Sequence, residues 1–212
     1  MTGQKGVRGV WAGLVAAALA AAPAYSQDSG AAPAPEPRFT AFQDVCVEAR
    51  ASYATLEAAA QAQGWAEAEV GDRPELTRVM AQARSFAAQG MTIRAIRLFS
   101  REIVGGERGF LALSNYDNRG QEVIGCAFYA FDAPQTVPGA LVREWVGVAA
   151  DDWREQPNRF ISQVWTNPPS MPGVAVFRHM YLQRQDGAAP DTVAGMILSI
   201  VATPSTAPAP TE

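Results

Sequence analysis

Two stretches in the first half of the chain carry hydrophobic residues at helical spacing. From Phe39 onward the apolar positions recur at intervals of three and four, which predicts an amphipathic helix that ends near Gly64. Thr40 and Gln43 have the spacing of a capping box at its start. A second helix is predicted over residues 74–89. The first part of the folded region is therefore expected to be helical.

Beyond residue 90 the pattern changes to short runs of β-forming residues separated by turn residues, which is typical of an antiparallel meander. Six strands are predicted, over residues 92–103, 108–117, 121–132, 159–166, 174–184 and 192–203. The pair Gly105-Gly106 and the segment 117–120 have the composition of hairpin turns. A short helix is predicted over residues 137–146, between the third and fourth strands, with Gly147 as its cap.

This order of elements predicts an α+β domain. N-terminal helices are expected to pack on a mostly antiparallel sheet of about six strands, with one helix inserted between strands 3 and 4. The third strand is apolar at nearly every position, as in a central strand covered on both faces. Ile124, Cys126 and Phe128 share one of those faces, because side chains alternate along a strand.

The N-terminus has the pattern of a secretory signal peptide. Lys5 and Arg8 precede an uncharged stretch rich in Ala, Val and Leu, and small residues permit cleavage after Ala24 or Ser26. An uncut membrane anchor is the alternative. The organisation predicted on this basis is a signal peptide over 1–26, a disordered linker over 27–38, a single domain over 39–203 and a disordered tail over 204–212. The protein is then periplasmic or secreted, with no membrane span after signal cleavage.

Charge narrows the choice of partners. The only lysine lies in the signal peptide, so the chain from residue 27 onward carries 15 arginines against 21 acidic residues, a net charge of −6. An acidic chain without an arginine cluster is not expected to bind nucleic acid. Chemistry that needs a lysine amine, such as a Schiff base or a P-loop, is excluded from the processed chain. No cofactor is predicted.

Export also changes the interpretation of the two cysteines. In an oxidising compartment an isolated pair most often forms a disulfide, so we predict Cys46–Cys126. The first helix must then lie across the Cys126 face of the third strand, because the Cα atoms of a disulfide lie within about 7 Å. No metal site is predicted, since two cysteines 80 positions apart and a single histidine make a poor ligand set.

Two residues are candidates for ligand binding. Trp165 stands at the base of a loop over 165–173 that contains three prolines, where an aromatic ring can form one wall of a site. The alternative is that Trp165 belongs to the core. His179 is the only histidine and lies in a predicted strand, facing a groove or solvent. No nucleophile elbow accompanies it, so no catalytic residue is assigned.

Carboxylates are the remaining candidates for chemistry. They are Glu102, Glu107, Asp151, Asp152 and Glu155. A glycosidase needs two carboxyl groups on opposite sides of one bond, and adjacency in sequence does not provide that arrangement. A solvated loop is the simpler interpretation of the Asp151-Asp152 pair.

Several local patterns resemble a group of small exported proteobacterial proteins of uncharacterised function. They are Phe42-x3-Cys46, Gly64-Trp65, the strand around Cys126, Glu144-Trp145-Val146-Gly147, and Trp165 with Pro172-Gly173-Val174. The resemblance covers about residues 39–203 and its motifs are structural. It implies a periplasmic location and a disulfide, and it assigns no catalytic residue.

Three functional hypotheses follow. The first is an exported, disulfide-stabilised, non-enzymatic module of the cell envelope that binds a small ligand or an envelope protein through the sheet edge or the 165–173 loop. The second is an envelope-polymer hydrolase, which requires two carboxylates and His179 in one concave pocket. The third is a structural or assembly factor, which requires an exposed apolar patch or an uncapped edge strand.

Overall fold

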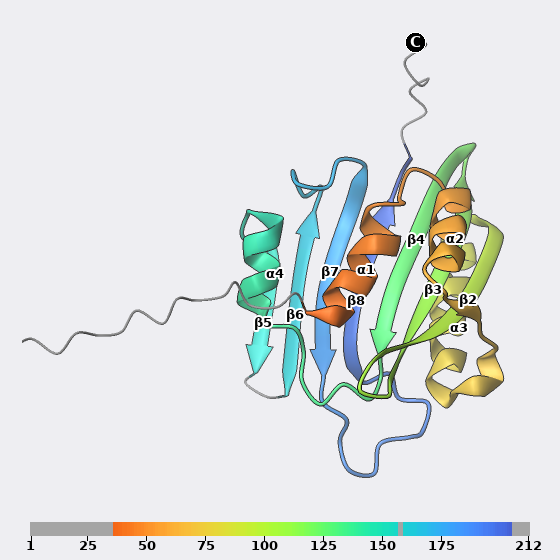
Figure 1. The fold of residues 1–212 in the computed structure, drawn as a ribbon. Helices are drawn as coiled ribbons and strands as arrows, with labels where there is room; N and C mark the ends of the chain where they lie inside the picture. The colour runs from red at the N-terminus through yellow and green to blue at the C-terminus, as the bar shows by residue number, and fades with distance from the viewer. Residues whose placement is uncertain (1–35, 157–158, 205–212) are drawn as a thin grey trace, which may run out of the picture. The chain divides into compact units, whose positions relative to one another are not determined.

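A computed structural model describes residues 36–156 and 159–204 (Figure 1). Its centre is one antiparallel sheet of eight strands in the order β1-β2-β3-β4-β8-β7-β6-β5. The strands are β1 (Ala66–Glu67), β2 (Thr92–Val104), β3 (Glu107–Asn118), β4 (Gln121–Ala130), β5 (Asp152–Gln156), β6 (Phe160–Thr166), β7 (Val174–Leu182) and β8 (Gly195–Ala202). The predicted signal peptide, most of the predicted linker and nearly all of the predicted tail lie outside the described residues.

The helices are short. They are α1 (Pro37–Phe42), the π-helix η1 (Gln43–Val47), α2 (Tyr53–Ala62), the 3-10 helix η2 (Val70–Asp72), α3 (Pro74–Ser85), the 3-10 helix η3 (Phe86–Gln89) and α4 (Gly139–Val146). None of the helices formed by the described residues combines the length and apolar character of a membrane span.

The predicted fold class was wrong in its strand number and in the place of the inserted helix. The sheet has eight strands, and α4 lies between β4 and β5. The two strands that the sequence pattern missed are the two sheet edges. β1 has only two residues, and all five residues of β5 are exposed, so neither shows the alternation of buried and exposed positions that predicts a strand. The structure does contain the predicted mixture of α and β elements and the predicted antiparallel pairing of strands.

The predicted helix over 39–64 is interrupted. The Glu36 carboxylate accepts from the Phe39 N–H and caps α1, and a second start follows at Ser52. The Ser52 Oγ accepts from the Thr55 N–H while the Thr55 Oγ1 accepts from the Ser52 N–H, so the capping box lies here and not at Thr40. The predicted end at Gly64 is confirmed by its left-handed φ of 75°.

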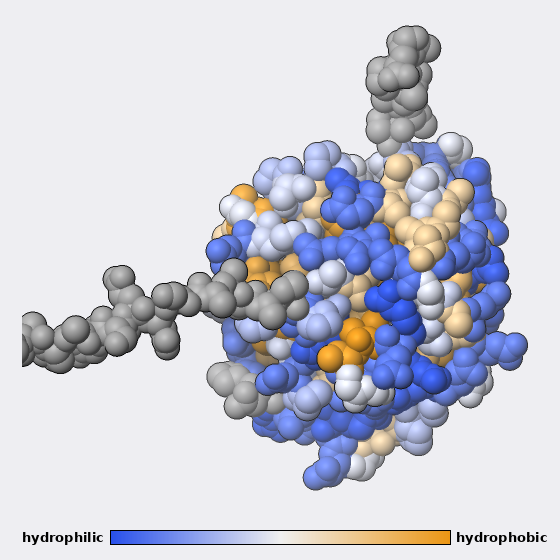
Figure 2. All heavy atoms as spheres, viewed as in Figure 1, coloured by the Kyte–Doolittle hydropathy of each residue, from blue (hydrophilic) through white to orange (hydrophobic). Residues whose placement is uncertain are grey.

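The main core lies between the sheet and a layer formed by α1, η1, α2 and α4 (Figure 1). The predicted disulfide is confirmed: Cys46 in η1 is bonded to Cys126 in β4, with the Cα atoms 5.4 Å apart. The N-terminal helical segment therefore crosses the predicted face of this strand. Figure 2 shows that the outer surface of this layer is mostly hydrophilic, with hydrophobic colour confined to separate patches.

The opposite face of the sheet is covered only in part. Leu76 and Val79 of α3 form a second core with Leu98, Phe110 and Tyr129, from the half of the sheet that contains β2, β3 and β4. Among the described residues, this second core includes no residue of β5, β6 or β7, whose same face forms the other half of the sheet. We call this uncovered region the bare half-sheet.

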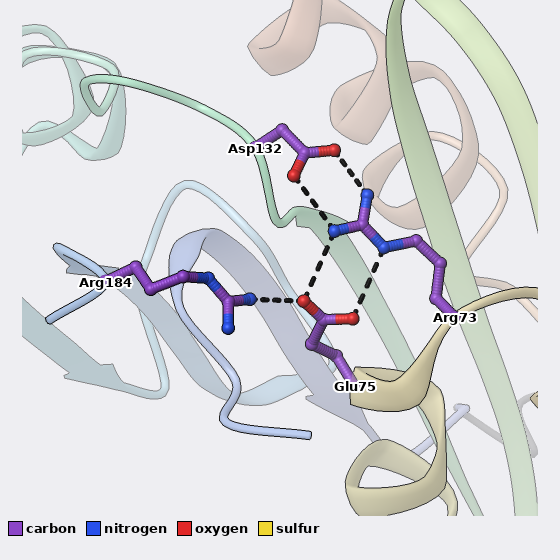
Figure 3. A network of polar contacts seen from close by, with 4 residues as sticks. All are labelled: Arg73, Glu75, Asp132 and Arg184. Carbon is purple, nitrogen blue, oxygen red and sulfur yellow. Dashed lines mark hydrogen bonds and ion pairs between the residues drawn. The ribbon is translucent and has the colours of Figure 1, made fainter. Parts of the chain in front are cut away.

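An ion-pair network fixes the start of α3 against the sheet (Figure 3). The Glu75 carboxylate, 2% exposed, accepts from Arg73 at 3.2 and 3.3 Å and also from Arg184, which follows β7. Arg73 also donates to both carboxylate oxygens of Asp132 after β4. This contact lowers the pKa of the Asp132 carboxyl below its usual value. The network joins three segments that are distant in sequence.

Replacing Glu75 by alanine is expected to lower the free energy of unfolding by about 2 kcal/mol, because two arginines lose a buried acceptor. The partial exposure of both guanidinium groups limits the cost. Urea denaturation measures the change. The matched control is Arg78→Ala, which removes an exposed ion pair with Asp191 and should cost less than about 0.5 kcal/mol. Equal effects of the two variants would show that the network has no special role.

Candidate functional site

The two predicted ligand-binding residues lie close together and are buried. Trp165 is 1% exposed, stacks on Phe177 with the ring centroids 5.1 Å apart, and donates from its indole Nε1 to the Val148 carbonyl. His179 is 0% exposed. Both side chains face the α4 layer from the paired strands β6 and β7. Their role in ligand binding stays a prediction, because both are enclosed by the core in this structure.

His179 belongs to a buried polar chain. Its Nδ1 lies 3.2 Å from the Gln163 Oε1 and its Nε2 lies 2.7 Å from the Thr136 Oγ1. An amide oxygen only accepts, so the Nδ1 carries the hydrogen and the Nε2 accepts from the Thr136 hydroxyl. Burial, aided by the nearby Arg143 cation, lowers the pKa of His179 to about 4. The imidazole is therefore neutral and holds its neighbours in place.

A cavity of about 440 Å³ borders this chain at Thr136. It is lined by Pro134, Gln135, Thr136, Glu155, Arg159, Ile161, Tyr181 and Gln183. Glu155 is the only one of the five candidate carboxylates in its lining. Asp151 instead accepts from the Thr166 N–H, and Asp152 accepts from Arg154. The pair of carboxylates that the hydrolase hypothesis requires is not assembled in this cavity, and the described residues contain no cluster of metal-ligating side chains.

A second candidate site is a groove on the opposite face of the sheet, beside α3. It runs across β3, β4 and β8, from α3 at one end to Arg178 of β7 at the other, and has a volume of about 90 Å³. The floor consists of small side chains, and the α3 wall adds apolar contacts. The floor residues are Ala112, Ser114, Gly125, Ala127 and Ser199, and the wall residues are Val79, Gln82, Ala83 and Phe86. We call this site the α3 groove.

The register of the paired strands explains why the side chains of the groove floor are all small. Ala112 lies opposite Ala127, which lies opposite Ser199, so three small side chains form one row across the sheet. In the adjoining row Ser114 lies opposite Gly125, and a Cβ atom added at Gly125 would overlap the Ser114 hydroxyl. A larger residue at position 125 would therefore require the Ser114 hydroxyl to move. A row of small residues beside a helix leaves space that larger side chains would fill.

Two tyrosines line the groove. The Tyr116 hydroxyl donates to the Ala83 carbonyl of α3 at 2.9 Å. The Tyr129 side chain also lines the groove and is 8% exposed. Burial raises the pKa of Tyr129, so this hydroxyl keeps its proton. Tyr129 therefore adds a protonated hydroxyl to the groove lining, whereas the Tyr116 hydroxyl donates to α3.

Arg178 provides the positive end of the groove. It is exposed on β7 directly opposite Ser199 on β8, and it forms no ion pair within residues 36–156 and 159–204. Beyond it the bare half-sheet continues with partly exposed apolar side chains, including Val164, Val176 and Met180. A cationic group thus lies between an apolar groove and an apolar sheet face.

Comparisons with known proteins do not identify a relative. No family model matches the chain, and no curated protein or solved structure matches it significantly. The predicted resemblance to small exported proteins therefore stays untested, and the class of this protein is defined by its fold and site. It is a disulfide-bonded α+β domain with one helix-covered sheet face and one face that is half bare.

Sequence reasoning missed the α3 groove. Its signal was present as small residues at alternate positions of three strands: 112 and 114, 125 and 127, and 199. Those positions become one floor only through the pairing of β3 with β4 and of β4 with β8. The order of these strands in the sheet does not follow from their spacing in sequence.

Proposed function

We propose that this protein is an exported, non-enzymatic binding module of the cell envelope, and that the α3 groove is its binding site. The observation that carries the proposal is the groove itself: a floor of small residues against α3, with Tyr129 and Arg178 in its lining. Apolar sites with a few placed polar groups are typical of ligand binding. The Cys46–Cys126 bond fits an oxidising compartment, which supports the exported location that residues 1–26 predict.

We also propose that this protein is related to other exported domains. The predicted resemblance to small periplasmic proteins of uncharacterised function is part of this proposal, and the disulfide is consistent with that resemblance. The apolar bare half-sheet favours a second candidate, an assembly factor that packs this face against another protein. The two candidates differ in the surface used, since the ligand site is confined to the groove.

Binding of the neutral apolar dye N-phenyl-1-naphthylamine tests the site. The wild-type protein is expected to bind it saturably with increased fluorescence. Ala127→Trp places an indole on the groove floor and should weaken dye binding by at least about tenfold, a loss of about 1.4 kcal/mol. Thermal unfolding of each variant establishes that it is folded.

Two controls make the result specific. Ala58→Trp adds the same side chain to an exposed position of α2, and Val164→Asp alters the bare half-sheet outside the groove. Both should bind the dye as the wild type does. Unchanged binding in Ala127→Trp, or no saturable binding in the wild type, would refute the groove as an apolar site. Selective loss in Val164→Asp would favour the assembly factor.

A further inference from the structure

The α3 groove has one apolar end and one cationic end. Pairing across four strands places Ala112, Ala127, Ser199 and Arg178 in a single row, from β3 to β7. Three strand spacings correspond to about 14 Å. α3 lies over the β3 end of this row, and the β7 end is open. The row thus has the length and polarity of an extended amphiphile, with its polar group at Arg178.

The low floor of the apolar end suits an unbranched chain or a flat ring better than a branched group. The floor offers only methyl, hydroxymethyl and hydrogen side chains, while Val79, Ala83 and Phe86 of α3 form the side wall. Tyr116 and Tyr129 lie on either side of the small-residue rows, since they follow Ser114 and Ala127 at alternate positions of β3 and β4.

The polar end contains a cationic group and two hydroxyl groups. Arg178 has no acidic partner among the described residues, and the nearest carboxylate across β6 on the same face, Asp152, is already paired with Arg154. Ser199 lies in the strand position opposite Arg178, and Tyr129 lines the groove from the adjoining row of β4. A carboxylate accepts from all three kinds of group, and its hydrogen bonds with a guanidinium are stronger than those of neutral acceptors.

We propose that the α3 groove binds a medium-chain aliphatic carboxylate, with Arg178 as its counter-ion, Tyr129 and Ser199 as hydrogen-bond donors, and the hydrocarbon chain lying on the small-residue floor toward α3. This inference rests on the proposed function and adds the chemical class of the ligand.

Displacement of the bound dye tests the ligand class. Dodecanoate, dodecanol and dodecyltrimethylammonium share one chain length and differ in charge, and each is used below its micelle-forming concentration. Dodecanoate is expected to displace the dye from the wild type at a concentration about tenfold below that of dodecanol, and the cation should be weakest. Butyrate, which has the carboxylate without the long chain, should fail to displace the dye.

Arg178→Gln is the decisive variant. It should remove the preference for dodecanoate over dodecanol and leave displacement by dodecanol unchanged. Arg154→Gln, on the same face but outside the groove, is the matched control and should keep the preference. Tyr129→Phe should weaken dodecanoate several-fold more than dodecanol, because it removes one donor at constant ring volume.

The outcomes separate this inference from the proposed function. Equal displacement by dodecanoate and dodecanol in the wild type, or a preference that survives Arg178→Gln, would overturn the carboxylate ligand and leave an apolar groove. Displacement by butyrate as effective as that by dodecanoate would overturn the role of the hydrocarbon chain. Absence of dye binding, or dye binding insensitive to Ala127→Trp, would refute the groove and the ligand class together.

Discussion

Replacing Cys46 and Cys126 together by alanine is expected to lower the free energy of unfolding by about 4 kcal/mol. The bond joins η1 to β4 across 80 positions of the sequence. In the chain-entropy model, a crosslink over a loop of this length removes many conformations from the unfolded chain, which destabilises the unfolded state. Typical domains have a net stability of about 5–15 kcal/mol, so the loss is large.

Urea denaturation of the wild type and the double variant measures this effect. Both cysteines are buried, so the alanine variant also loses sulfur contacts in the core. Reduced wild-type protein separates the two contributions, because reduction breaks the crosslink and keeps the sulfur atoms. The chain has only two cysteines, so reduction affects no other bond. A change below about 1 kcal/mol on reduction would show that the crosslink contributes little.

Local patterns predicted much of this fold because the relevant contacts are local. The alternation of apolar residues identified six strands close to their observed bounds, and the turns at Gly105-Gly106 and at 119–120 join β2 to β3 and β3 to β4 as expected. The helix of residues 137–146 and its left-handed cap at Gly147 are also present. These features depend on neighbours within one turn or one hairpin.

The errors concern features that depend on distant partners. The edge strand β5 has no alternation in exposure because the side chains on both of its faces are exposed. The break between η1 and α2 follows from the cap at Ser52, in a segment where the apolar spacing alone favoured a continuous helix. Likewise, α3 and α2 lie on opposite faces of the sheet, and no pattern within either helix specifies its face.

The candidate site likewise depends on partners that are distant in sequence. His179 was expected to face a groove or solvent, and it is instead enclosed by Thr136 from the segment before α4 and by Gln163 of β6. Hydrogen bonds with polar residues from distant segments offset the free-energy cost of burying a histidine. The alternation of residues along one strand contains no information about such partners. The α3 groove was missed because it depends on pairing between β4 and β8, the two central strands.

Burial of His179 predicts that the protein loses stability in mild acid. The folded-state pKa of about 4 lies below the usual value of 6.5, so between these values the unfolded chain binds a proton that the folded protein does not. The free energy of unfolding should therefore be highest above pH 6.5, fall as the pH decreases from 6.5 to 4, and show no further contribution from this residue below pH 4. The expected loss is about 3 kcal/mol.

The comparison of wild type with His179→Asn isolates this contribution. The asparagine cannot take up a proton in this range, so any cost of lost packing is the same at each pH and the difference between the proteins should shrink as the pH falls from 7 to 4.

The acids with lowered pKa, Asp117 and Asp132, titrate below their usual value and retain their effect in both proteins. Burial raises the pKa of Glu107, which favours the folded state in acid and is likewise common to both. Urea denaturation at half-unit pH steps measures the difference in free energy of unfolding between the two proteins. A constant difference across this range would mean that His179 is protonated in the folded protein. That result would contradict the buried hydrogen bonds of His179 with Thr136 and Gln163.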